Sequence, residues 1–387
     1  MEELYYRYNP WWEDEYKFSV YKERPVVFSA LKKDLESKSI VFLTGLRRVG
    51  KTTLMKRLIQ YLLSQKVSPR HIFYMSMDDY TLSSKSILSL IEEYRTLQKL
   101  SYQESVYVFL DEITYQKGFE RQLKNIYDQQ LVKIVASSSS ATLLRNRASF
   151  LTGRHITREI QPLNFSEYLT FKDIVLKKSD SHLLHTYFED YLQTGGMPEY
   201  VLEKNVEYLR QLVDDILYKD IAAHYNITNT QLLKDFFLLL MERAGKIVSI
   251  NKLAHILEIS PDTAKRYLQM FTDTYLIYLV PRYGKTSSLV RAPKKLYAAD
   301  LGIRTFFTGF RDKGSLFENY VFLKLKQKNL RYVYEEGIEL DFMTEDKELI
   351  EIKYGTELTE KQKKLFNSFP AIKKTIISSV EEVEKYK

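Results

Sequence analysis

One short stretch, GLRRVGKT from Gly45 to Thr52, limits the folds open to this chain more than any other part of the sequence. Two glycines frame the loop, lysine and threonine follow the second, an apolar run (IVFLT) precedes it, and a stretch with apolar residues at helical spacing comes after it. Glycines let the backbone curl so that successive N–H groups face a phosphate, and the N-terminus of the following helix adds its dipole. The stretch therefore predicts a phosphate-binding loop between a strand and a helix.

The residue types of this loop point to a nucleoside triphosphate with Mg²⁺, and we take ATP as the ligand. Lys51 would place its charge on the β- and γ-phosphates, and the Thr52 hydroxyl is a hard oxygen ligand for Mg²⁺. The predicted nucleotide contacts are Gly45, Leu46, Arg47, Arg48, Val49, Gly50, Lys51, Thr52 and Thr53.

A second acidic motif follows at the end of another apolar run, VYVFLDE. Five apolar residues predict a buried strand, so Asp111 and Glu112 should project from its carboxyl end, beside the phosphates. We expect Asp111 to hold Mg²⁺ through water and Glu112 to polarise the attacking water. Asp78 and Asp79, after the preceding strand, are interpreted as a solvated turn.

A run of serines ends a further predicted strand, VKIVASSSS. Ser138 or Ser139 could sense the γ-phosphate or orient the water, and we name Ser138 as the catalytic candidate. A helix N-cap is the structural alternative.

From Ser39 to about Pro162, short apolar strands alternate with amphipathic helices, which predicts an α/β fold with a parallel sheet covered on both faces. From Asn164 to about Ala244 the pattern is almost purely helical. It is interrupted at Thr194–Tyr200 (TGGMPEY), where two glycines and a proline must end a helix.

Composition sets limits on partners and location. The formal net charge is +8, which favours an acidic partner such as nucleic acid. The absence of cysteine excludes disulfides and thiolate metal sites and fits a reducing cytoplasm. No apolar run approaches the ~20 residues of a membrane span, and the N-terminus is acidic and aromatic, unlike a secretory signal. We therefore expect a cytoplasmic protein without a membrane partner.

Residues 232–290 show a helix, a turn, a second helix and a β-ribbon, the pattern of a winged helix-turn-helix. Ser260 is the expected N-cap of the second helix, and Pro261 fits its first position. The first turns of that helix and the ribbon would contact DNA, although winged helices also serve as spacers and protein-docking modules. The candidate DNA contacts are Thr263, Lys265, Arg266 and Arg282, with Asp262, Lys285, Arg291, Lys294 and Lys295 nearby.

Taken together, these motifs resemble the AAA+-type P-loop ATPases of bacteria and archaea that carry a C-terminal nuclease-like domain. The resemblance covers nearly the whole chain and includes YNPWWE, LRRVGKTTL, FLDEI, SSSSATLL, LTGRH, QPLNFSEYL, GGMPEY, YKDI and ADLG…GSLFENYV…ELDF…IEIKY.

The resemblance implies further roles. Arg154 becomes the arginine that reaches a γ-phosphate, either in its own chain or in a neighbouring subunit of a homo-oligomer, with a structural salt bridge as the alternative. Arg158 is a second candidate, and Arg24-Pro25 would pack near the adenine. Phe317–Tyr354 is placed in a PD-(D/E)xK-like fold, with Glu318 as its helical acidic residue.

The residues of this C-terminal stretch carry their own argument. Asp341 ends one predicted strand, and Glu351 and Lys353 share a face of the next. If the strands pair as a hairpin, the two carboxylates come close and repel unless they are protonated or bridged by Mg²⁺ or Mn²⁺. Lys353 would then steady a scissile phosphate. An ordinary charged hairpin is the alternative, since Glu-x-Lys is common in a lysine-rich chain and Glu339 could compete for the role of Asp341.

We therefore predict four parts: an AAA+ P-loop ATPase core (1–163), a helical lid (164–231), a winged helix-turn-helix (232–290) and a PD-(D/E)xK nuclease-like domain (291–387). The expected function is ATP hydrolysis coupled to action on DNA, with a metal-dependent nuclease centre at Glu318, Asp341, Glu351 and Lys353. The alternative is a nucleotide-gated regulator or scaffold whose C-terminal domain binds DNA or protein without cleavage.

Overall fold

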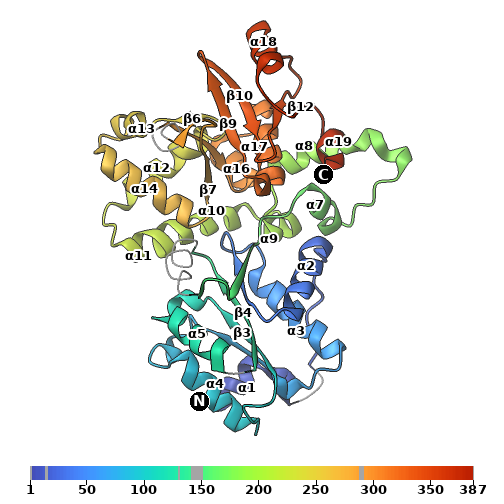
Figure 1. Cartoon of the computed structure of the whole chain (residues 1–387), viewed down its shortest axis with the longest axis vertical. Coiled ribbons are helices and arrows are strands. Elements are labelled where there is room, and N and C mark those ends of the chain that lie inside the picture. The colour runs from blue at the N-terminus through green and yellow to red at the C-terminus, as the bar shows by residue number, and fades with distance from the viewer. Residues whose placement is uncertain (1, 14–15, 130, 141–150, 287–291, 387) are drawn as a thin grey trace. The chain divides into compact units, whose positions relative to one another are not determined.

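The computed structural model describes residues 2–13, 16–129, 131–140, 151–286 and 292–386. The chain divides into two compact units, Met1–Gln161 and Pro162–Lys387, which run from blue to green and from green to red in Figure 1. Each unit has its own buried core, and each is described by itself.

The first unit contains a five-stranded, fully parallel sheet with the strand order β2-β3-β4-β1-β5. The parallel α/β arrangement predicted for this region is confirmed. Its strands are β1 (Ile40–Thr44), β2 (Ile72–Ser76), β3 (Val106–Asp111), β4 (Val132–Ser138) and β5 (His155–Glu159).

Every residue of β1 is buried. Because successive side chains of a strand point to opposite faces, a wholly buried strand must be covered on both sides. The helices of this unit supply the cover (Figure 1). Their buried apolar positions follow the helical period that the sequence shows. They are α2 (Pro25–Glu36), α3 (Lys51–Ser64), α4 (Ile87–Leu97) and α5 (Phe119–Gln129).

The parallel register brings the carboxyl ends of the central strands to one edge of the sheet. Thr44 lies beside Ser138, and Ser76 lies beside Asp111. The loop after β1 and the acidic end of β3 therefore meet at the same edge.

The N-terminal segment binds to the free edge of β2. It forms α1 (Glu2–Tyr8) and a short 3-10 turn (Pro10–Trp12). The fully buried Asn9 side chain accepts a hydrogen bond from the Tyr74 N–H (2.6 Å) and donates one to the Tyr74 carbonyl (3.0 Å), so it pairs with the strand as a neighbouring backbone would. The indoles of Trp11 and Trp12 donate to the carbonyl of Ile72 at 3.2 and 2.9 Å. This segment satisfies edge groups that the sheet leaves unpaired.

The second unit begins with a run of helices, as the sequence predicts. The predicted break at Thr194–Tyr200 separates α8 from α9, with Gly195 at the helix end (φ 73°) and Pro198 opening the next helix. The π-helical turn Ile216–Ala222 was not predicted. The helices are α7 (Phe165–Phe171), α8 (Leu184–Thr194), α9 (Pro198–Glu203), α10 (Val206–Asp215), α11 (Ala223–Tyr225) and α12 (Thr230–Glu242).

Two small sheets follow. The first has three antiparallel strands in the order β6-β8-β7, and the second has four in the order β12-β11-β10-β9, with β11 and β12 parallel. Their bounds are β6 (Ile247–Val248), β7 (Ile277–Val280), β8 (Lys294–Ala298), β9 (Arg331–Glu335), β10 (Ile338–Met343), β11 (Glu348–Ile352) and β12 (Lys373–Ile377). The helices between and around them are α13 (Ile250–Ile256), α14 (Pro261–Asp273), α16 (Leu301–Thr308), α17 (Lys313–Leu325), α18 (Glu360–Ser368) and α19 (Val380–Lys385).

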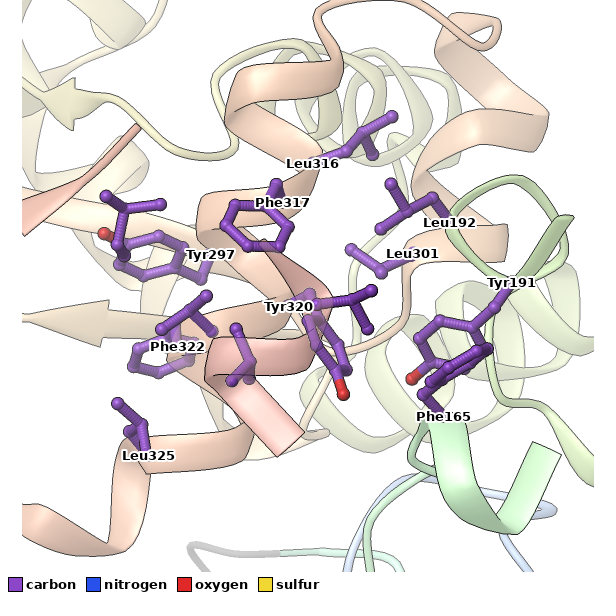
Figure 2. Packing of buried hydrophobic residues seen from close by; sticks show 14 of the residues in the cluster. Phe165, Tyr191, Leu192, Tyr297, Leu301, Leu316, Phe317, Tyr320, Phe322 and Leu325 are labelled. Carbon is purple, nitrogen blue, oxygen red and sulfur yellow. The ribbon is translucent and has the colours of Figure 1, made fainter. Parts of the chain in front are cut away.

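One aromatic-rich core connects the segments of this unit. Figure 2 shows Phe165 and Tyr191 of the first helices beside Tyr320 of α17, with Tyr297 of β8 and Phe322 in the same layer. The rings of Tyr297 and Phe322 stack with centroids 4.2 Å apart. The segments predicted as lid and nuclease-like domain thus share this buried core, and Val280 of the predicted winged helix joins it, while a smaller cluster lies between Val333 and Phe369.

Glycines allow the α8–α9 connection to touch the start of α16. A Cβ on Gly302 would lie 1.9 Å from the Thr194 carbonyl oxygen, and one on Gly196 would lie 2.1 Å from the Leu163 carbonyl oxygen. The buried Asp300 carboxylate fastens this contact by accepting from the N–H groups of Gly196 (2.7 Å) and Ile303 (2.9 Å). Burial raises the pKa of Asp300 to about 6, and these N–H groups offset part of that rise.

In the described residues, no helix combines the length and the apolar composition needed to cross a bilayer.

Replacement of Gly302 tests this contact. We expect Gly302→Ala to lower the free energy of unfolding by about 1–3 kcal/mol, because the new Cβ meets a backbone carbonyl and the backbone must shift. Gly314→Ala is the matched control, since Gly314 is also helical and has open space at its Cβ position. Urea unfolding followed by circular dichroism should show a lower midpoint for Gly302→Ala and an unchanged or slightly higher one for Gly314→Ala. Equal midpoints for the two variants would contradict the close approach.

Candidate functional site

The phosphate-binding loop predicted after the first strand leads from β1 into α3. Gly45 has φ 132°, and a Cβ there would lie 2.2 Å from the Ile160 carbonyl oxygen. Gly50 has φ 96° and caps α3. Both positions therefore need glycine, the first for space and the second for its backbone angle.

Lys51 lies inside the curve of this loop. Its side chain is 5% exposed, and its Nζ donates to the carbonyls of Gly45 (2.9 Å) and Leu46 (3.1 Å). Arg24 supports the loop from behind, donating to the carbonyls of Val49 (3.2 Å) and Gln161 (3.0 Å). The ammonium is thus held inside the loop by the loop's own carbonyl groups.

The structure brings the two predicted Mg²⁺ ligands together. The Thr52 hydroxyl donates to Asp111 Oδ2 at 2.6 Å. The same oxygen accepts from the Tyr74 hydroxyl at 2.9 Å, and Oδ1 accepts from the Ser137 hydroxyl. Asp111 is therefore fixed by hydroxyls from α3, β2 and β4.

Tyr74 and Ser137 are absent from the predicted site. Burial and the Asp111 carboxylate raise the pKa of Tyr74, so its hydroxyl stays protonated and can donate. Tyr74 lies two residues before Ser76, which pairs with Asp111 across β2 and β3. Its place near Asp111 could be predicted only if the pairing of these two strands were known. The serine run offered several hydroxyls and no means of choosing among them.

The predicted general base, Glu112, follows Asp111 with φ 48°, a left-handed conformation that is uncommon outside glycine. Its N–H donates to the Ser137 hydroxyl (2.9 Å), and its Oε2 accepts from both the N–H and the hydroxyl of Ser139, each at 3.2 Å. Ser138 instead meets the Thr114 hydroxyl at 3.2 Å. The structure therefore places Ser139, rather than the chosen candidate Ser138, beside the base.

Arg154 does not lie at the nucleotide end of its own sheet. β5 runs parallel to β1 with His155 beside Ile40, so Arg154 precedes the strand at the edge away from Gly45, roughly 15 Å along the strands. Its guanidinium pairs with Asp128 at 3.0 Å. The prediction that it reaches a γ-phosphate within its own chain is wrong; action on a neighbouring subunit stays a prediction. Arg158, the second candidate, pairs with Asp34 at 2.7 Å.

A cavity of about 620 Å³ opens beside Thr52, Asp111 and Glu112. Its walls combine loop arginines with aromatic side chains of the N-terminal segment, and the lining includes Arg47, Arg48, Ser139, Tyr8, Trp11, Tyr16 and Phe18. Three of the predicted nucleotide contacts, Arg47, Arg48 and Thr52, therefore border one open space with Asp111 and Glu112.

The second unit assembles the predicted nuclease residues as well. β10 and β11 pair as a hairpin, with Phe342 beside Ile350. The Asp341 N–H donates to Glu351 Oε2 at 3.0 Å, and Lys353 pairs with Glu351 at 3.0 Å. Glu318 of α17 faces the same cluster.

Lys295 of β8 occupies the centre of this cluster. Its ammonium lies 2.6 Å from Glu318, 2.5 Å from Glu339 and 3.0 Å from Asp341. The prediction that Lys295 lies along DNA is wrong, because the residue is 1% exposed. The sequence does not show which side chains of β8 point inward: Lys295 is buried, while the neighbouring Lys294 is exposed.

Burial and charge set the ionisation of the cluster. Burial alone would lower the pKa of the Lys295 ammonium, but the carboxylates around it hold that pKa well above its ordinary value. Burial, reinforced by Asp341, raises the pKa of Glu318 to about 7 and that of Glu351 to about 8. As the described side chains lie, with the Lys295 ammonium among these carboxylates, no group of three or more acidic or histidine side chains could hold a metal ion. The structure gives no support to the second Mg²⁺ or Mn²⁺ site that the sequence suggested.

The candidate DNA contacts divide between exposed and occupied side chains. Ser260 caps α14 as predicted, accepting from the Thr263 N–H at 3.1 Å, and Lys265 and Arg266 are exposed on that helix. Thr263 also uses its hydroxyl in the cap. Arg282 is half-buried and donates to the Tyr334 carbonyl. Arg291 lies outside the described residues.

Comparison with known proteins finds two matching family models. An AAA domain matches residues 37–169, and a domain of unknown function, DUF8612, matches residues 185–314. The chain is 30% identical over 376 residues to an uncharacterised protein of Methanocaldococcus jannaschii, covering 90% of this chain and 83% of that one. It is 26% identical to an uncharacterised protein of Haemophilus influenzae, covering 83% of each. Among solved structures, a Walker-type ATPase of Pyrococcus abyssi aligns over 74% of this chain and 96% of its own, with 14% identity and a TM-score of 0.47.

The archaeal relative and this chain belong to one family, and the AAA domain match includes Lys51, Thr52, Asp111 and Glu112. The chain is a P-loop ATPase of the AAA+ class.

In this ATPase the side chains present fit a triphosphate with Mg²⁺. The Thr52 hydroxyl and the Asp111 carboxylate are hard oxygen ligands 2.6 Å apart, and the Lys51 ammonium lies within the loop that precedes them. The DUF8612 match includes Lys295 but ends before Glu318, so it covers only part of the acidic cluster.

Tyr74 provides a test of how Asp111 is held. We expect Tyr74→Phe to raise the Mg²⁺ concentration for half-maximal ATP hydrolysis roughly tenfold, because a hydrogen-bond partner that orients a metal ligand is lost. Tyr107→Phe on β3 is the control, since its hydroxyl is not among the partners of Asp111. Steady-state assays at varied Mg²⁺ would measure both, and identical Mg²⁺ dependence in the two variants would rule out a positioning role.

Proposed function

We propose that this protein hydrolyses ATP with Mg²⁺ at the carboxyl edge of the β2-β3-β4-β1-β5 sheet. The observation that supports this most directly is the meeting of Thr52, Asp111 and Glu112 at one cavity, directly after the loop that holds the Lys51 ammonium. These groups come from two segments far apart in the chain, and each has the chemistry that its proposed role requires.

Each residue has a distinct role in the proposed reaction. Backbone N–H groups of the loop after Gly45 and the N-terminus of α3 bind the phosphates, and Lys51 neutralises the β- and γ-phosphate charge. Thr52 and Asp111 would hold Mg²⁺, which neutralises developing phosphate charge when bound. Glu112 orients and polarises the attacking water, and Ser139 fixes the Glu112 carboxylate through two hydrogen bonds.

Two substitutions separate binding from turnover. We expect Lys51→Ala to weaken ATP binding roughly 10–100-fold, because charge-assisted contacts of about 1.5–3 kcal/mol are lost. We expect Glu112→Gln to keep ATP binding and to lower kcat about 100-fold or more. Calorimetry with ATP and a phosphate-release assay measure the two effects, with the surface change Glu92→Gln as the matched control. Full turnover in Glu112→Gln would show that Glu112 is not the general base. Unaltered ATP binding in Lys51→Ala would show that ATP does not bind at this loop.

We further propose that the second unit contacts DNA through α14. Support comes from the exposed Lys265 and Arg266 on the first turns of a helix that follows a Ser260-capped turn, and from the net charge of +8. In a winged helix-turn-helix the second helix is the one that enters the major groove. The β6-β8-β7 sheet would form the wing.

Salt dependence tests this contact. We expect the double variant Lys265→Ala/Arg266→Ala to weaken duplex DNA binding and to reduce the slope of log K against log salt by about 2, since each phosphate contact contributes about 1. Lys361→Ala, which removes an exposed charge from α18, should leave the slope within about 1 of the original. Fluorescence anisotropy at several salt concentrations measures the slopes. An unchanged slope in the double variant would contradict the proposal that α14 contacts DNA phosphates.

The cluster around Lys295 favours a C-terminal part that binds its partner over one that cleaves DNA. The candidate nuclease residues Glu318 and Asp341 are both paired with this internal ammonium. This supports the alternative in which ATP turnover gates a C-terminal part that binds DNA or protein without cleaving it.

A further inference from the structure

The acidic cluster of the second unit is built around a lysine. Lys295 comes from β8, Glu318 from α17, and Glu339 and Asp341 from β10, so three elements deliver their side chains to one point. The ammonium lies 2.5–3.0 Å from an oxygen of each carboxylate. An ammonium has three N–H donors, and three carboxylate oxygens stand ready to accept them.

Further hydrogen bonds to these carboxylates fix the shape of the cluster. Asp341 Oδ2 accepts from the Ile352 N–H at 2.9 Å, and Glu318 Oε1 also accepts from the Tyr297 hydroxyl at 2.5 Å. The rings of Tyr297 and Phe342 lie 5.9 and 6.0 Å from the Lys295 ammonium and close the apolar side of the cluster. Buried charges are kept in proteins when they are paired and hydrogen-bonded in this way.

We propose that Lys295 takes the place that a divalent cation would occupy between Glu318, Glu339 and Asp341, so that this nuclease-like centre does not recruit Mg²⁺ or Mn²⁺. A divalent ion bound to the same oxygens would need to lie about 2.0–2.6 Å from each of them. That position overlaps the Lys295 ammonium, and two cations so close repel strongly in a buried site. The lysine and the metal exclude each other.

The proposal assigns Lys295 and Lys353 different tasks. Lys353 pairs with Glu351 at 3.0 Å and is the lysine of the Glu-x-Lys pattern. Lys295 lies in a different strand, outside that pattern, and contacts the other acidic residues. The cluster therefore takes its central cation from within the chain, and the fold keeps a nuclease-like constellation without its metal chemistry. This inference is independent of ATP hydrolysis in the first unit.

Mn²⁺ binding by the full-length protein tests the proposal, with Asp111→Asn present in every sample and ATP absent so that the nucleotide site does not contribute. Electron paramagnetic resonance measures free Mn²⁺ during a titration. We expect no binding that depends on Asp341 while Lys295 is present. Lys295→Ala should bind one Mn²⁺ per chain with an affinity at least about tenfold higher than that of the protein that keeps Lys295. The double variant Lys295→Ala/Asp341→Asn should lose this binding.

The matched control is Lys294→Ala, which removes the exposed neighbouring lysine and should behave like the protein with both lysines. Two outcomes overturn the proposal: Asp341-dependent Mn²⁺ binding while Lys295 is in place, or a folded Lys295→Ala protein that binds no Mn²⁺. If Lys295→Ala does not fold, the comparison of the Lys295-containing protein with its Asp341→Asn variant decides. Equal Mn²⁺ binding in those two supports the proposal, and a loss with Asp341→Asn overturns it.

Discussion

The Asp111 carboxylate is the point at which three parts of the first unit meet. It accepts hydroxyl hydrogen bonds from Thr52 at the start of α3, from Tyr74 on β2 and from Ser137 on β4. This is possible because the parallel strands end together at one edge, so that side chains distant in sequence become neighbours. The phosphate-binding loop, the proposed base and the cavity all take their positions from that shared edge.

The buried carboxylates Asp111 and Asp341 have different kinds of hydrogen-bond partner in the two units. In the first, Asp111 accepts hydrogen bonds from neutral hydroxyl donors, which orient its oxygens. In the second, Asp341, Glu318 and Glu339 are paired with the Lys295 ammonium, which offsets part of their charge. A carboxylate held by hydroxyls can still attract a cation, whereas one held by an ammonium has already acquired its cation. The same residue type therefore supports different chemistry in the two places.

The sequence predicts the parallel sheet of the first unit and its phosphate-binding loop because apolar period and glycine spacing are local signals. It also predicts the approach of Asp341 to Glu351, which needs only a hairpin. It does not predict the pairing of Lys295 with Glu318, since that depends on which face of β8 turns inward. Arg154 is misplaced for a related reason: its position follows from the register of β5 against β1, and motif spacing says nothing about register. The choice among Ser137, Ser138 and Ser139 likewise requires the strand's orientation.

The attachment of Asn9 and the two tryptophans to β2 also bears on how this protein stays unaggregated. An outer strand with unpaired N–H and carbonyl groups can recruit a strand from another molecule and extend the sheet between chains. Here a side-chain amide and two indoles occupy those groups at Tyr74 and Ile72. Removal of the segment through Trp12 would expose the edge of β2 to strands of other molecules. This short stretch therefore blocks intermolecular strand pairing as well as completing the fold.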